Sequence, residues 1–290
     1  MDEISALKKQ IELLQLELSI KNSKILKYQT EFIKLSSNLD LILSSSKQDI
    51  DQLNVIQSHL IPTELPQFPG FEISRKFSFG SHQGGDYFDL FSFPDKMKCA
   101  VLLASSSSYT MSASFLSVVL QNSSRFEGKS NKSIDEVINE TGFELLKLAQ
   151  PQDETQLFYG VFDRRHMTLQ FCCVGQIKAV LLPPLKSTHR AIKILSSASL
   201  GFKQDRQIKI ASIELNLQEG QRICLISQGL LNVLDESEIV EIAKETLSGT
   251  VHELRNQLFV KAQIKSGIER PVKDQTVIVI ELKKSIVKLA

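Results

Sequence analysis

The sequence lacks the features that would place the protein in a membrane or on a nucleic acid. None of its 290 residues falls in an apolar run that approaches 18 residues, so we predict no membrane span. Lysine and arginine together number 34 and aspartate and glutamate 33, which leaves a net charge of +1. That balance provides no electrostatic reason to expect binding to nucleic acid or to an anionic membrane.

The chain also has few cysteines, and none of them has the spacing of a metal site. All lie inside apolar runs without a C-x-x-C pair: Cys99, Cys172, Cys173 and Cys224. Buried thiols in a reducing compartment are the expectation. The sequence begins Met-Asp-Glu and continues as a charged amphipathic repeat, which is unlike a signal peptide. We therefore expect a cytoplasmic protein.

Motifs of several common enzyme classes are missing as well. The five histidines are scattered, with no i, i+4 pair that would indicate a zinc site. No Gly-x-Ser-x-Gly segment and no glycine-rich phosphate loop occurs in the chain. Serine hydrolysis and nucleotide binding therefore have no support.

The first 60 residues form a separate pattern, in which apolar side chains recur at alternating spacings of three and four residues. Of the 17 positions in this seam, from Ile4 to Leu60, 14 are apolar or aromatic. An isolated helix cannot bury such a stripe, so residues 1–60 are predicted to form a coiled coil that makes the protein a homodimer. The alternative, a helix packed on its own globular domain, stays open. Pro62 ends the helix, and residues 61–290 form the predicted globular domain.

From Phe71 onward the pattern changes to short alternating runs typical of strands, interrupted by helical segments. Ser133 and Glu136, and likewise Asp235 and Glu238, have the spacing of a capping box at a helix start. Many antiparallel strands with pairs of helices indicate an α+β layered sandwich. The predicted strands are 71–79, 87–93, 98–103, 156–162, 166–174, 177–182, 207–215, 221–227 and 275–282, and the predicted helices are 110–121, 133–148, one from 235 onward and 251–264.

Six short motifs occur along the domain in a recognisable order. They are Gln57 to Pro62, Gly84-Gly85-Asp86-Tyr87-Phe88-Asp89, Val174-Gly175-Gln176, Leu200-Gly201, Gly220 to Gly229 and Lys273-Asp274-Gln275-Thr276. In this order they resemble the SpoIIE/RsbU-type bacterial phosphatases, which are metal-dependent protein phosphatases (PPM) of the 2C class. The resemblance covers about residues 52–282. It implies a four-layer αββα sandwich, in which two antiparallel sheets pack face to face between helices.

The resemblance also implies a chemistry. Active members hold two Mg²⁺ or Mn²⁺ ions, which activate a bridging water to attack a phosphoserine or phosphothreonine on a small regulatory partner. Hard cations take oxygen ligands, and clustered carboxylates need the cations to offset their mutual repulsion. In such proteins a helical N-terminal segment transmits signals to the phosphatase domain, and the substrates are commonly STAS-domain regulators.

The positions that match the metal ligands of the family have largely lost their carboxylates. Asp86 matches the first ligand, but Ser105, Gln228 and Lys273 stand where the resemblance implies aspartates. Asp274 remains, at a position that is less involved with metal. We therefore predict a pseudophosphatase with no catalytic residue, metal ion or other cofactor. Its predicted partner is a STAS-domain regulator, a kinase or an active phosphatase.

Two alternatives stay open. An active enzyme could use Asp86, Asp89 and Asp274 with a single Mg²⁺ or Mn²⁺ ion, or the coiled coil could be the working part of a scaffold. Lys273 is expected either to offset the charge of Asp86 in place of the metal or to point to solvent. The serine run 105–108 is interpreted as a loop whose sequence has relaxed, rather than as an anion-binding site.

Overall fold

The computed structural model describes residues 14, 15, 17, 18, 20–24 and 27, and most of residues 68–283. The exceptions in the second range are residues 82–84, 109, 110, 112–114, 116, 117, 120, 188–190, 197–199 and 205–208. The chain divides into two compact units, residues 1–58 and residues 59–290.

In the first unit the described residues are helical, and their side chains, including those of Leu14 and Leu18, are exposed. The rest of the predicted coiled-coil segment lies outside the described residues. The coiled coil and the homodimer therefore stay predictions. In the part of the chain that the structure describes, no helix is both long enough and apolar enough to cross a bilayer.

The second unit is built on two antiparallel sheets. The first sheet has the strand order β1-β11-β10-β6-β7, with β1 (Phe71–Ser78), β11 (Gln275–Leu282), β10 (Arg222–Ile226), β6 (Lys178–Leu182) and β7 (Lys193–Leu195). The second has the order β2-β3-β4-β5-β9, with β8 paired to β4. Its strands are β2 (Gly85–Ser92), β3 (Lys98–Ser106), β4 (Glu154–Asp163), β5 (Thr168–Val174), β8 (Phe202–Lys203) and β9 (Ile213–Asn216). Because β1 and β2 belong to different sheets, the segment that joins them passes from one sheet to the other.

The helices with defined bounds are α3 (Ser123–Phe126), α4 (Ile134–Leu146), α5 (Gln228–Leu231), α6 (Glu236–Glu245) and α7 (Val251–Ser266). The three longest of them, α4, α6 and α7, begin within one residue of the predicted starts. Both capping boxes are confirmed, because the side chains of Ser133 and Asp235 accept hydrogen bonds from the backbone N–H groups of Glu136 and Glu238. The described residues of the predicted helix 110–121 are helical too.

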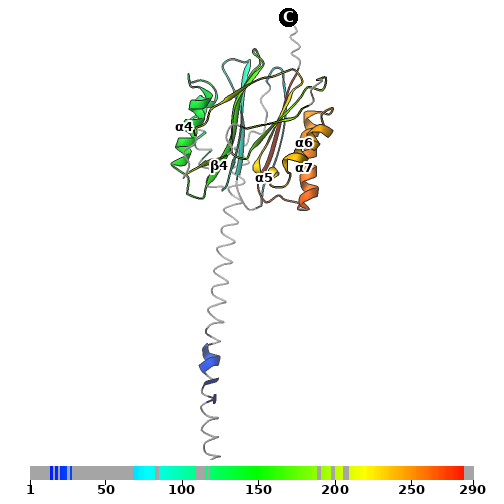
Figure 1. Ribbon diagram of the computed structural model, residues 1–290. Helices are drawn as coiled ribbons and strands as arrows, with labels where there is room; N and C mark the ends of the chain where they lie inside the picture. The colour runs from blue at the N-terminus through cyan, green and yellow to red at the C-terminus, as the bar shows by residue number, and fades with distance from the viewer. Residues whose placement is uncertain are drawn as a thin grey trace, which may run out of the picture. The chain divides into compact units, whose positions relative to one another are not determined.

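Helices cover the outer face of each sheet, so the unit has four layers (Figure 1). The helix α4 lies on the second sheet, and α6 and α7 lie on the first. One apolar cluster fills the space between the sheets, and each sheet has a further cluster under its helices. The alternation of β2 shows how this arises, since Phe88 and Leu90 face the other sheet while Tyr87 and Phe91 face the helices. The predicted αββα sandwich is confirmed.

The sequence-based prediction fails for the shortest elements. The predicted strand 207–215 is wrong at residues 209–212, which are not in a strand, and β9 begins only at Ile213. The strands β7 and β8 and the helices α3 and α5 were not predicted. They are two to four residues long, too short for a period to be recognised. The two strands form because β6 and β4 offer them a pairing edge.

Candidate functional site

Asp86 lies at the start of β2, which is an edge strand of the second sheet, and its side chain points between the two sheets. It is on the same face of β2 as Phe88 and Leu90, which belong to the core between the sheets. In the register of β2 with β3, Asp86 is directly opposite Ser105. The Asp86 side chain is buried, so the groups that satisfy its carboxyl oxygens come from the protein.

Hydroxyl groups surround the Asp86 carboxyl. Ser105 Oγ donates a hydrogen bond to Asp86 Oδ1 at 2.7 Å, and Thr276 Oγ1 donates one to Asp86 Oδ2 at 2.7 Å. The Ser227 hydroxyl also hydrogen-bonds this carboxyl. Thr276 belongs to β11 of the first sheet and Ser227 directly follows β10 of that sheet. The two are linked, because the Thr276 N–H donates to Ser227 Oγ at 2.9 Å. Asp86 therefore ties the two sheets together at one end of the sandwich.

The Asp274 carboxylate lies beside Asp86 and is held by backbone groups. The Gly80 N–H donates to Asp274 Oδ1 at 2.7 Å, and the Asp86 N–H donates to Asp274 Oδ2 at 3.1 Å. Burial and, after it, the charge of Asp274 raise the pKa of Asp86 from its ordinary 3.8 to about 7, although the surrounding hydroxyls favour the charged form. The donors to the two carboxyls identified among the described residues are hydroxyl and backbone N–H groups, which are neutral.

The ammonium group of Lys273 contacts Gln228 rather than Asp86. Lys273 Nζ donates to Gln228 Oε1 at 3.3 Å, and Gln228 Nε2 donates to Gln176 Oε1 at 3.0 Å. Within the described residues, Lys273 forms no ion pair with Asp86, and its half-buried side chain does not simply extend into solvent. Both expectations for Lys273 are therefore wrong. The physical reason is that Gln228 begins α5 and presents its amide oxygen to the lysine, while hydroxyls already enclose Asp86.

Two glycines at this end of the sandwich are required by close backbone approach. A Cβ on Gly229 would lie 1.9 Å from the backbone oxygen of Asp274, and a Cβ on Gly80 would lie 2.6 Å from the backbone carbon of Lys273. Both glycines pack against the segment that enters β11. Gly229 is thus needed for packing, whether residue 228 is acidic or not.

The residues at this site do not fit a divalent metal ion. The oxygens of Asp86 and Asp274 already accept hydrogen bonds from neutral donors. Among the residues that the structure describes, no group of three or more His, Cys, Asp or Glu could hold a metal. Asp89 lies on the opposite face of β2, where its Oδ2 accepts a hydrogen bond from the Tyr87 hydroxyl at 3.0 Å. Since Mg²⁺ takes an octahedral set of oxygen ligands, two enclosed carboxyls do not provide a site.

The serine run 105–108 is divided between the end of β3 and the bend that follows it, so its interpretation as a relaxed loop is wrong for Ser105 and Ser106. Ser105 and Ser106 complete β3 and are buried. The Ser107 hydroxyl hydrogen-bonds Glu154, the first residue of β4, and the Ser108 hydroxyl hydrogen-bonds Asp153, which precedes it. Each of these serines therefore fixes one strand end relative to a neighbouring strand.

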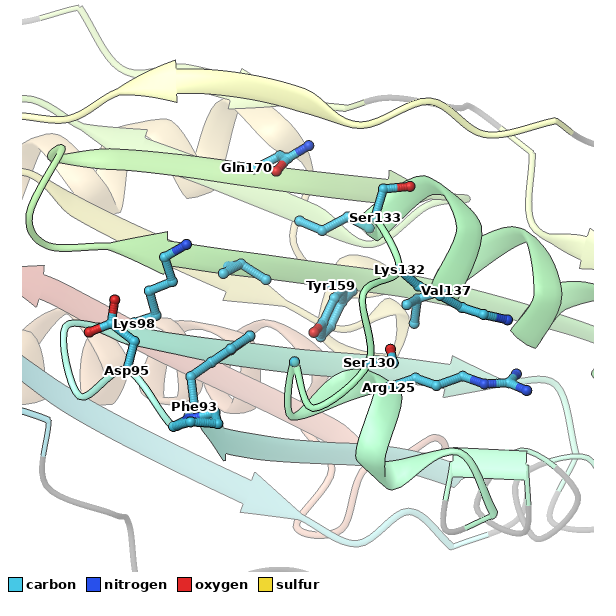
Figure 2. Close-up of a pocket in the computed structure, with 14 residues that line it drawn as sticks. Phe93, Asp95, Lys98, Arg125, Ser130, Lys132, Ser133, Val137, Tyr159 and Gln170 are labelled. Carbon is cyan, nitrogen blue, oxygen red and sulfur yellow. The ribbon is translucent and has the colours of Figure 1, made fainter.

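A separate cavity of about 370 Å³ lies over the outer face of the second sheet, next to the start of α4 (Figure 2). Its lining includes Lys98, Arg125 and Lys132. Lys98 pairs with Asp163 at 3.5 Å, and both Arg125 and Lys132 pair with Glu140. Because these cations are already matched by carboxylates, the cavity has no excess positive charge that would favour an anionic ligand.

Comparison with known proteins identifies the family. The profile described as Stage II sporulation protein E (SpoIIE) matches residues 98–283, which is more than half of the chain. The chain belongs to the SpoIIE family. Its second unit is accordingly a PPM-type serine/threonine phosphatase domain by descent. No curated protein sequence matches the chain.

Solved structures of phosphatase domains share the fold of this SpoIIE-family chain. The SiaA-PP2C domain of Pseudomonas aeruginosa is 13% identical with a TM-score of 0.63, and the match covers 82% of this chain and 98% of that one. The RsbU and RsbW domains of Rv1364c from Mycobacterium tuberculosis are 15% identical with a TM-score of 0.61. That match covers 76% of this chain and only 63% of the other. The phosphatase domain of SpoIIE from Bacillus subtilis is 13% identical with a TM-score of 0.53, covering 77% and 98%. At these identities the likeness concerns the fold alone.

The site contains partners that the sequence-based reasoning missed. It placed Asp86, Ser105 and Asp274 at one site, and the structure brings these three together. It did not assign Ser227 and Thr276 as hydrogen-bond partners of Asp86. Each lies at or next to a strand end, on the face that points between the sheets. The positions two and four residues along the same strand are apolar, so a hydroxyl breaks the series. That interruption is the signal that would have identified them.

Proposed function

We propose that this SpoIIE-family protein is a metal-free pseudophosphatase, which acts in cytoplasmic signalling by binding a protein partner without hydrolysing a phosphate ester. The observation that carries the proposal is the hydrogen bond from Ser105 Oγ to Asp86 Oδ1 at 2.7 Å. A neutral donor stands where the family resemblance implies a second carboxylate. The carboxyl that would bind metal is instead used to join the two sheets.

The chemistry of the remaining side chains supports binding rather than hydrolysis. In a metal-dependent phosphatase the metal ions lower the pKa of the attacking water and neutralise charge on the phosphate. Lys273 and the amides of Gln228 and Gln176 can donate hydrogen bonds to an anionic group. None of these groups can generate a hydroxide nucleophile near neutral pH.

The proposed partner is a STAS-domain regulator, with a kinase or an active phosphatase as the other candidates. The proposed assembly is a homodimer through residues 1–60. Its support is the apolar seam in the sequence together with the exposure of Leu14 and Leu18 in the first unit.

Metal binding and turnover test the proposal together. Calorimetric titration with MnCl₂ is expected to show no stoichiometric binding, and hydrolysis of a phosphoserine peptide is expected not to exceed that of the Asp86→Ala variant. Tight binding of one or two Mn²⁺ ions per chain would contradict the proposal. Turnover that Asp86→Ala abolishes would contradict it as well.

Restoring the missing carboxylates provides a matched gain-of-binding test. The triple variant Ser105→Asp, Gln228→Asp and Lys273→Asp is expected to be less stable than wild type without metal, because it gathers acids around Asp86. Adding Mn²⁺ is expected to raise the Tm of the triple variant but not of wild type, since only the variant binds the ion in its folded state. If Mn²⁺ leaves the Tm of both proteins unchanged, these positions are not the lost metal site.

A further inference from the structure

The helix α7 carries apolar side chains on two faces. One face packs on the first sheet and buries residues that include Leu254, Leu258 and Phe259. The other face exposes Val260 and Ile264, with 44% and 73% of their surface accessible. A surface helix of a globular protein ordinarily keeps its apolar residues on the face that packs on the core. The exposed face of α7 therefore lacks a covering element within the described domain.

Two further exposed apolar residues follow the end of the helix. Gly267 ends α7 in the left-handed conformation with φ 64°, and Ile268 and Val272 follow with 47% and 51% of their surface accessible. We call Val260, Ile264, Ile268 and Val272 the α7 patch. Single exposed apolar residues are common on soluble proteins, but these four occur within 13 consecutive residues, which is why we consider the segment as an interaction surface.

The α7 patch belongs to a basic segment of a chain that is nearly neutral overall. Between residues 255 and 273 the basic side chains are Arg255, Lys261, Lys265, Arg270 and Lys273, and the one acidic side chain is Glu269. Lys265 is matched by Glu238 of α6 at 2.6 Å. Lys261 and Arg270 are exposed and form no ion pair with any other residue that the structure describes. The patch is thus flanked by cations that are available to an acidic partner.

The helix is anchored to the first sheet, so this surface exists before any partner binds. The Ser74 hydroxyl of β1 hydrogen-bonds His252 Nδ1 at 2.8 Å. Arg255 Nη1 donates to the backbone oxygen of Arg75 at 3.0 Å. A pre-formed surface loses little conformational entropy on binding, which favours affinity.

We propose that the α7 patch docks an acidic amphipathic helix of a partner protein. Val260 and Ile264 are one helical turn apart, which suits the apolar stripe of a second helix packed against α7. Lys261 and Arg270 pair with carboxylates that flank this stripe. The inference rests on the proposed function, because it supplies the binding protein with a docking surface.

Two other occupants fit this surface less well. A symmetric contact between two copies of the chain through this patch would place two sets of these cations in one interface without adding carboxylates to match them. An anionic membrane is ordinarily recognised by clusters of about four to eight basic residues, and the free cations beside the patch are fewer. An acidic amphipathic helix can cover the apolar side chains of the α7 patch and place carboxylates beside Lys261 and Arg270.

Two fluorescein-labelled synthetic peptides of about 18 residues test the proposal on the full-length protein. Both have leucine at i, i+3, i+4 and i+7. One has glutamate at the flanking positions and the other has lysine there. Fluorescence anisotropy is expected to show saturable binding of the acidic peptide alone.

Three variants locate the binding. Ile264→Gln is expected to lower the affinity for the acidic peptide about tenfold, because one aliphatic side chain is lost from the interface. Arg270→Glu is expected to lower the affinity for the acidic peptide by a similar factor at low salt and by a smaller factor at high salt. Phe143→Gln replaces an exposed apolar residue of α4 and serves as the matched control, with no expected change.

Equal binding of the two peptides, no saturable binding of the acidic peptide, or unchanged binding by Ile264→Gln would overturn the proposal. Sedimentation velocity and flotation with phosphatidylglycerol vesicles test the other occupants. A dimer or a vesicle complex that Ile264→Gln abolishes would also overturn it.

Phosphoserine-peptide turnover is measured on the same samples. Turnover with intact docking would refute the proposed function alone, and absent docking without turnover would refute this inference alone.

Discussion

Replacing Asp86 with asparagine should separate the charge of this side chain from its shape. In the wild-type protein the buried carboxyl accepts hydrogen bonds from Ser105 and Thr276 and lies beside Asp274, and its pKa is raised to about 7. Asparagine has nearly the same volume and keeps an acceptor oxygen, and the serine and threonine hydroxyls can also accept from its amide. It cannot ionise, however. Asp86→Asn therefore removes the titration and keeps the packing.

The sign of the effect follows from the direction of the pKa shift. A carboxyl whose pKa is higher in the folded than in the unfolded chain binds more protons when folded, so its ionisation destabilises the fold. The contribution of Asp86 to the free energy of unfolding therefore falls as the pH rises from about 4 to about 7. Above about pH 7 this contribution no longer changes with pH. The difference between 3.8 and about 7, at about 1.4 kcal/mol for each pH unit, corresponds to a loss of about 4 kcal/mol. Asp86→Asn avoids this loss.

Urea unfolding at a series of pH values measures the effect. Tyrosine fluorescence is a suitable signal, because Tyr87 and Tyr159 are buried in the second unit. Contributions from titrating groups that do not interact with Asp86 are common to both proteins and cancel when wild type and Asp86→Asn are compared at each pH. The difference therefore reports Asp86 together with its interaction with Asp274. The variant is expected to gain stability relative to wild type by up to about 4 kcal/mol as the pH rises from about 4 to about 8.

The control is Glu241→Gln, which removes one exposed carboxyl from α6, away from Asp86. If the stabilities of wild type and Asp86→Asn stay parallel across the whole pH range, the reasoning is refuted. In that case Asp86 is ionised at every pH tested, and a cation or water must stabilise its charge.

Two further substitutions test the packing around this site. Thr276→Val removes one hydroxyl donor from Asp86 and should lower the free energy of unfolding by about 1.5–3 kcal/mol in urea at pH 8; a loss below about 0.5 kcal/mol would show that the bond contributes little. Gly229→Ala places a Cβ 1.9 Å from the backbone oxygen of Asp274 and should cost about 3 kcal/mol or more, measured as a fall in Tm. Gly267→Ala, which meets no atom within 4 Å but has φ 64°, should cost only about 1–2 kcal/mol, so equal losses for the two alanine variants would contradict the steric argument.

Much of the fold could be predicted because its signals are local. The pairs Ser133–Glu136 and Asp235–Glu238 cap their helices through contacts three residues apart, so the sequence contains the whole motif. Long strands such as β4 and β11 are apolar over enough residues to be recognised. The strands β7 and β8 could not be predicted, because they exist only where a neighbouring strand offers its edge.

The surface of α7 shows the same limit. The sequence predicts a helix over residues 251–264, but not which of its apolar side chains are covered. Packing on the first sheet decides that Leu258 is buried and Ile264 is exposed. Sequence alone therefore cannot distinguish a core helix from a docking helix when both faces are apolar.

The sequence by itself determined that positions 105, 228 and 273 carry no carboxylate, because residue type is read directly and no folding can change it. Only the tertiary structure decided what Asp86 does instead. Its hydroxyl donors Ser105 and Thr276 lie 19 and 190 residues away along the chain, on strands of two different sheets. Their approach within 2.7 Å depends on the register of each sheet and on how the sheets face each other, which no local pattern in the chain specifies.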